Sequence, residues 1–137
     1  MGFDLIAFLG EKAREVCKKR DFVPIDPSPA ERHGSWEWSF HKKSAGLDRF
    51  VSVALSNLPT GGLPDTWYNV EISAGADNGE RFAKHIVLSD FRAIERQDYS
   101  ASVEAMLQER LPRAIEIAER LKSGDLTEVY LSPRSSR

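Results

Sequence analysis

The first apolar residues of the chain recur three and four positions apart, which is the repeat of an amphipathic α-helix. This repeat predicts a helix over residues 4–20, with Asp4 as the N-cap and charged residues on the opposite side. The prolines at positions 24, 27 and 29 exclude further helix, so we expect an extended connector there. The apolar side of the predicted helix consists of Leu5, Ile6, Leu9, Ala13, Val16 and Cys17.

From residue 34 to residue 89 apolar and polar positions alternate, as they do in half-buried β-strands. In the last strand of this region Phe82, Ile86 and Leu88 are expected to face inward, and Lys84 breaks the alternation. The alternation predicts four strands, at residues 36–41, 49–56, 66–74 and 81–89. The inward-facing residues expected in the first three strands are Trp36, Trp38, Phe40, Val51, Val53, Leu55, Tyr68, Val70, Ile72 and Ala74.

A second helical repeat begins near Ser100 and predicts a helix that ends at Gly124, the expected C′ residue. Pro112 lies deep inside this helix, so we expect a kink close to it. Residues 125–131 are expected to add a short extended piece, and residues 132–137 a flexible tail. The order of helix, four strands and helix predicts one α+β domain over residues 1–131, an antiparallel meander with both helices on one face.

The composition of the 137-residue chain is that of one globular domain, with 41% apolar side chains. Its 19 basic and 21 acidic side chains leave a net charge of −2, which argues against a dedicated nucleic-acid-binding protein. The lone Cys17 excludes an intramolecular disulfide, so we expect a cytoplasmic protein with a buried, unreactive thiol. No apolar run has the length of a membrane helix, and the N-terminal residues do not form a signal-peptide pattern.

Catalytic and metal-binding motifs are not evident in the sequence. The three histidines, His33, His41 and His85, lack the spacing of a structural metal site. Neither a nucleophile elbow nor a phosphate-binding loop occurs, and the carboxylates lie in polar sequence rather than in an apolar pocket. We therefore expect no metal, no cofactor and no enzymatic activity. One alternative remains, in which His85 with Glu37 or Glu71 binds a metal or acts as a base.

If both helices cover one face of the sheet, the opposite face is open, and we expect function there. The predicted register sets Trp38 opposite Val53, Val53 opposite Val70, and Ala74 near residues 79–81. A polar face with a few aromatic rings suits a protein interface, and the alternative is a solvated sheet face. Two predicted loops, residues 57–65 and 90–99, are further candidate contact elements. The candidate partner-binding residues are Glu37, His41, Phe50, Trp67, Asn69, Glu71 and His85.

Several features resemble small bacterial α+β proteins that include immunity proteins of toxin–immunity systems. They are a first helix ending in Arg20-Asp21-Phe22, an aromatic strand over residues 36–40, a strand over residues 68–72 and a last amphipathic helix. The resemblance implies a cytoplasmic, non-catalytic protein that neutralises a cognate partner, such as a toxin domain, by binding it. The near-neutral charge and the lack of a long apolar run predict no nucleic-acid and no membrane partner.

Two other functions remain compatible with the sequence. The first is a secretion-chaperone-like or adaptor homodimer, because such small proteins also lack catalytic motifs and associate with themselves. The second is a small-ligand binder or enzyme that uses the outer sheet face, with Trp67, Asn69, Glu71 and His85. The sequence alone leaves the oligomeric state open.

Overall fold

The computed structural model describes residues 5–32, 35–56, 67–92 and 96–129. The predicted N-cap Asp4, the histidine His33, the loop at residues 57–65 and the tail at residues 132–137 lie outside this part of the chain. The described elements are α1 (Leu5–Lys18), β1 (Val23–Pro24), β2 (Ala30–Arg32), β3 (Ser35–Ser44), β4 (Leu47–Ser56), β5 (Trp67–Asp77), β6 (Arg81–Arg92), α2 (Arg96–Arg120), the 3₁₀-helix η1 (Ser123–Asp125) and β7 (Glu128–Val129).

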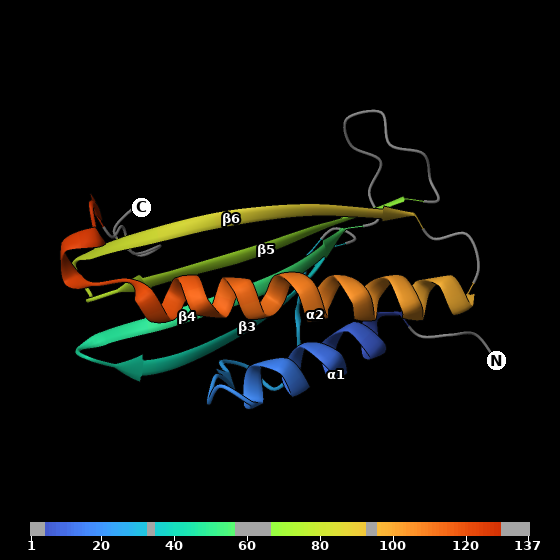
Figure 1. The fold of residues 1–137 in the computed structure, drawn as a ribbon, viewed down its shortest axis with the longest axis horizontal. Helices are drawn as coiled ribbons and strands as arrows, with labels where there is room; N and C mark the ends of the chain where they lie inside the picture. Colours follow the sequence, from blue (N-terminus) through green and yellow to red (C-terminus); the bar gives the residue numbers. More distant parts are fainter. Residues whose placement is uncertain (1–4, 33–34, 57–66, 93–95, 130–137) are drawn as a thin grey trace.

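The described strands form one antiparallel sheet in the order β1-β3-β4-β5-β6-β7, and β2 also pairs with β3 (Figure 1). The long strands β3 to β6 follow one another in the chain and in space, so the predicted α+β class and antiparallel meander are confirmed. The predicted number of four strands is too low. The short strands β1, β2 and β7 extend the sheet, and two or three residues are too few to show an alternating pattern in the sequence.

The β3–β4 hairpin turns through Ala45 and Gly46, both of which have positive φ angles (53° and 77°). This two-residue turn sets Trp38 opposite Val53, as predicted. Between β4 and β5 the predicted register is wrong by two residues, because Val53 lies opposite Ile72 rather than Val70. A shift of two keeps the same residues on each face of the sheet.

The β5–β6 turn sets a register between these two strands that differs from the predicted one. The Asn78 side-chain oxygen accepts hydrogen bonds from the backbone N–H groups of Glu80 and Arg81, at 2.8 Å each. The ladder that leads out of this turn sets Asp77 opposite Phe82 and Ala74 opposite His85, so the prediction of residues 79–81 opposite Ala74 is wrong. The sequence identified the turn but not its length, and that length decides the faces of β6.

The faces of β6 are the reverse of those predicted. Residues directly opposite each other in a sheet share a face, so Ala83 and His85 lie on the helix side, with the buried Ala76 and Ala74. Phe82, Lys84 and Ile86 lie on the opposite face, and 55% of the Ile86 side chain is exposed. Lys84 therefore follows the alternation, and the interpretation of Phe82 and Ile86 as inward-facing is wrong.

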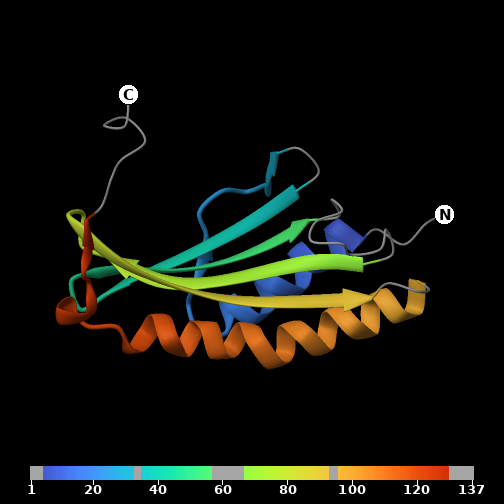
Figure 2. The same cartoon turned by 90° about the horizontal axis from the view of Figure 1, so that it is seen from above.

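Both helices pack against the same face of the sheet. Buried residues of α1 and α2 meet the inward residues of β3, β4 and β5 in one core, which confirms the predicted placement of the helices. Figure 2 shows α2 running alongside the strands on one side of the sheet. Gly10 permits close contact of α1 with β3, because a Cβ there would collide with the Trp38 indole. The core residues contributed by the helices include Leu9, Ala13, Cys17, Val103, Leu107, Leu111, Ala114, Ile115 and Ala118.

Helix α2 is longer than predicted. It begins at Arg96 rather than near Ser100, within residues that were expected to form a loop, and it continues through Pro112. Figure 1 shows α2 as one continuous ribbon, so Pro112 does not interrupt the helix. The helix ends at Arg120, and Gly124 lies in η1, so the predicted C′ role of Gly124 is wrong.

A buried arginine from β4 binds the C-terminus of α2. Arg49 is only 4% exposed, and its Nη1 donates to the carbonyl oxygens of Ala118 (2.6 Å), Glu119 (3.1 Å) and Leu121 (2.8 Å). The last carbonyl groups of a helix have no donor within the helix, and a cation is favourable at this negative end. The Nε of Arg49 also donates to Ser44 Oγ at 2.8 Å. Arg49 therefore fixes the end of α2 on the sheet.

Candidate functional site

We call the face of the central sheet opposite the helices the outer face. Its middle row carries small polar side chains. This row runs through Ser39, Ser52 and Ser73 of three neighbouring strands. The hydroxyl oxygens of Ser39 and Ser52 lie 3.1 Å apart, and Ser73 is buried. Because these side chains are short, the row forms a low, hydroxyl-lined floor between larger neighbours.

The next row of the outer face is built around an aromatic ring. Phe50 lies between His41 of β3 and Gly75 of β5 in the ladder. A Cβ on Gly75 would collide with the Phe50 ring and with the carbonyl oxygen of Ala83, so only glycine allows the ring to pack against β5. Phe50 remains half-buried, with part of its surface open on the outer face.

These rows border a cavity of about 370 Å³ on the outer face, which we call the outer-face cavity. Its apolar lining on the outer face comes from Phe50 and Phe82, and Val129 of β7 borders it at the edge of the sheet. Hydroxyl groups and charged side chains complete the lining. The polar lining residues are Ser52, Ser73, Glu37, Asp77 and Lys84.

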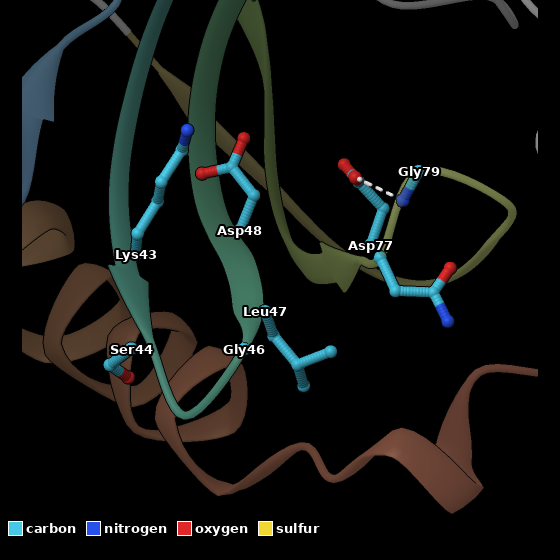
Figure 3. A pocket seen from close by; sticks show the side chains of 8 residues that line it. Lys43, Ser44, Gly46, Leu47, Asp48, Asp77 and Gly79 are labelled. Carbon is cyan, nitrogen blue, oxygen red and sulfur yellow. Dashed lines mark hydrogen bonds between the residues drawn. The ribbon is translucent and has the colours of Figure 1, made fainter.

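A second cavity, of about 540 Å³, lies between the tips of the β3–β4 and β5–β6 hairpins (Figure 3). Figure 3 shows the Lys43 ammonium group directed toward the Asp48 carboxylate, and Asp77 bonded to the backbone N–H of Gly79. Asp77 lines both this cavity and the outer-face cavity. The two hollows therefore share one carboxylate.

Two carboxylates lie opposite each other where the cavities meet. Asp48 and Asp77 are cross-strand partners, and like charges in this position repel. Asp48 Oδ1 lies 3.1 Å from His41 Nδ1. Burial raises the pKa of Asp77, and the negative charge of Asp48 adds to this effect, while the hydrogen bond from Gly79 opposes it. A cationic group bound here would favour the ionised form of Asp77.

Four of the predicted site residues lie on the outer face. Glu37 and Phe50 line the outer-face cavity, His41 contacts Asp48, and Glu71 lies opposite Ala54 on the same face as Glu37. The sequence missed Ser73, Asp77, Phe82 and Lys84, and the alternation along β6 would have indicated the last two if its phase had been recognised.

The structure does not place the other three predicted site residues on the described outer face. His85 lies opposite Ala74 and is exposed on the helix side of the sheet, so it cannot act together with Glu37 or Glu71 across the outer face. Its placement on the outer face is wrong because the β5–β6 turn sets a different register. Trp67 and Asn69 lie in β5, opposite Arg92 and Asp90, and their side chains are outside the described part of the structure.

The described ranges contain no group of three or more His, Cys, Asp and Glu side chains that could hold a metal ion. Cys17 is buried, as predicted, and burial raises the pKa of its thiol to about 12. No helix within the described residues is long and apolar enough to cross a membrane.

Comparison of the chain with protein-family models, with curated proteins and with solved structures gives no significant match. We therefore argue function from the outer face itself, through the side chains that line its cavity and the charges that surround them.

Proposed function

We propose that the protein is a non-catalytic binding module of the immunity or inhibitor type, which neutralises a cognate partner protein by covering part of its surface. The outer-face cavity supports this proposal, because Phe50 and Phe82 form an apolar lining beside polar and charged groups. Protein interfaces combine an apolar, aromatic centre with a polar rim in the same way. The partner is expected to insert a side chain into this cavity.

The charges around the cavity indicate which side chain of the partner fits. Among the described outer-face residues acidic groups outnumber lysines, although the whole chain is nearly neutral. A basic side chain of the partner would relieve the repulsion between Asp48 and Asp77, and its aliphatic stem would pack against Phe50. Recognition then rests on this local patch rather than on a long-range field. The acidic residues are Glu37, Asp48, Glu71, Asp77 and Glu128, and the lysines are Lys43 and Lys84.

We place the protein in the cytoplasm and assign it no catalytic role. The buried Cys17 thiol requires no oxidising compartment, and its high pKa makes it a poor nucleophile. The separation of His85 from Glu37 and Glu71 removes the acid–base arrangement that the sequence left open.

A small-molecule ligand is a second candidate occupant of the outer-face cavity. Its volume of about 370 Å³ lies within the range of small-molecule sites. The lining would suit a compact ligand that carries an apolar group and a cation, with the cation beside Asp77. A small-molecule ligand would bind without any partner protein, so affinity capture distinguishes this candidate from the partner-binding function.

Affinity capture with matched variants tests the proposal. Ser52→Arg places a long charged side chain on the floor of the cavity, whereas Ser28→Arg makes the same change in the exposed connector. The wild type and Ser28→Arg should recover one protein in stoichiometric amount from native lysate, and Ser52→Arg should lose it while unfolding at a similar temperature. Recovery of the same protein by all three baits would overturn the proposal. Retention of a small molecule alone, detected by native mass spectrometry, would also overturn it and favour the second candidate.

A further inference from the structure

Among the described residues, most of one edge of the sheet has no strand beside it. Strand β7 pairs only with Arg81 and Phe82 of the 12-residue strand β6. It cannot follow β6 further, because the chain before Glu128 leads back to η1. Within the described residues, positions 83–92 of β6 therefore have a strand neighbour only in β5, and Figure 1 shows β6 along the upper border of the sheet.

This edge has the properties of a pairing strand. The unpaired N–H and C=O groups of an edge strand can bind another strand, and proteins that avoid such pairing use short edges, prolines, bulges or charged side chains that find no partner in the pairing strand. No proline interrupts residues 83–92, and the middle of this segment is the apolar run Ile86-Val87-Leu88. The Ile86 side chain is exposed.

We propose that β6 pairs antiparallel with β6 of a second copy of this chain, about a twofold axis at Val87. Such an axis is perpendicular to the sheet and keeps the outer faces of both copies on the same side. Residues that lie opposite each other must then both be even-numbered or both be odd-numbered, which leaves few registers. The two sheets become one, and their outer faces become continuous.

The charges along β6 select the register centred on Val87. In this register Lys84 of one copy lies opposite Asp90 of the other, and Ile86 lies opposite Leu88. The next allowed register, centred on Leu88, would set Lys84 opposite Arg92 and Ile86 opposite Asp90. Opposite charges in cross-strand positions stabilise pairing, and like charges oppose it.

The preceding allowed register is shorter. Centred on Ile86, it ends at residue 83 because β7 occupies Arg81 and Phe82. The register centred on Val87 uses residues 83–91, nearly all of the free edge, and the twofold axis repeats the pair of Lys84 with Asp90 on both sides. A second copy of the chain therefore fits the edge in length and in charge.

Charge exchange tests this dimer. Lys84→Glu and Asp90→Lys each set like charges opposite each other at both symmetry-related positions, so each variant should raise the dimer dissociation constant about tenfold or more. The double variant Lys84→Glu/Asp90→Lys should dimerise as the wild type does. A mixture of the two single variants should form a heterodimer, because the acidic positions of one copy meet the basic positions of the other.

Light scattering after size exclusion gives the mass, and native mass spectrometry identifies the heterodimer. The wild type and the exposed control Lys19→Glu should have twice the monomer mass of 15.4 kDa. A monomeric wild type at every concentration, or a dimer that both single variants leave intact, would overturn the proposal. Ser52→Arg should remain dimeric, so loss of partner capture and loss of the dimer are separate outcomes.

Discussion

Replacing Arg49 with methionine should remove the hydrogen bonds that hold the end of α2. Methionine keeps much of the apolar stem but donates no hydrogen bond, so the carbonyl groups of Ala118, Glu119 and Leu121 lose a buried cationic donor. A hydrogen bond to a charged group contributes about 1.5–3 kcal/mol, and leaving a buried acceptor without a donor costs about 1–3 kcal/mol. Partial hydration of the freed carbonyl groups, and the relief of the cost of burying the guanidinium, limit the sum of these three bonds, so we expect a loss of about 3–5 kcal/mol in the free energy of unfolding.

Urea unfolding followed by circular dichroism and tryptophan fluorescence measures this loss. Arg49→Lys keeps the charge but loses the bond to Ser44, so its stability should lie between those of the wild type and Arg49→Met. Lys43→Met is the control, because this lysine is exposed and its loss should change stability by less than about 0.5 kcal/mol. The capping role of Arg49 would be refuted if Arg49→Met unfolded within about 1 kcal/mol of the wild type.

Three further predictions concern single side chains. Gly75→Ala should lower stability by about 1–3 kcal/mol in urea unfolding, because the new Cβ meets a backbone carbonyl, whereas Gly124→Ala, which meets nothing, should not. Asp77→Asn should raise the free energy of unfolding by less than about 1 kcal/mol at neutral pH. Because the folded-state pKa of Asp77 is raised, this gain should shrink as the pH falls through that value toward 3.8, and a gain that grows in acid would contradict the assignment. Cys17 should react with a thiol reagent only as the chain opens, and labelling as fast as in denaturant would contradict its burial.

The local repeats of the sequence were sufficient to predict most of the fold. The spacing of Leu9, Ala13 and Cys17 predicted α1, and the alternation around Trp38 and Val53 predicted the β3–β4 pair. These predictions succeeded because each repeat lies within a single helix or strand. Placement of both helices on one face followed from the apolar stripes. The site was predicted less completely, since it depends on how neighbouring strands align.

The failed predictions have identifiable physical causes. The larger apolar residues of β6, Phe82 and Ile86, lie on the outer face, and the smaller Ala83 lies against the core, so hydrophobicity alone gives the wrong phase. Such a conflict between pattern and structure is expected at a functional surface. Arg49 was missed although it occupies an inward position of β4, where a charged residue requires a partner. That partner, the end of α2, is far away in sequence.

Side-chain footprinting by hydroxyl radicals is the most direct test of binding through the outer face. The protein is oxidised alone and in complex with the partner that the wild type captures, and the modified residues are quantified by mass spectrometry. We expect oxidation of Phe50 and Phe82 to fall in the complex, while the exposed Ile25 of the connector reacts equally in both samples. Unchanged oxidation of Phe50 and Phe82, with protection of Ile25 or of helix residues instead, would contradict the proposed binding face.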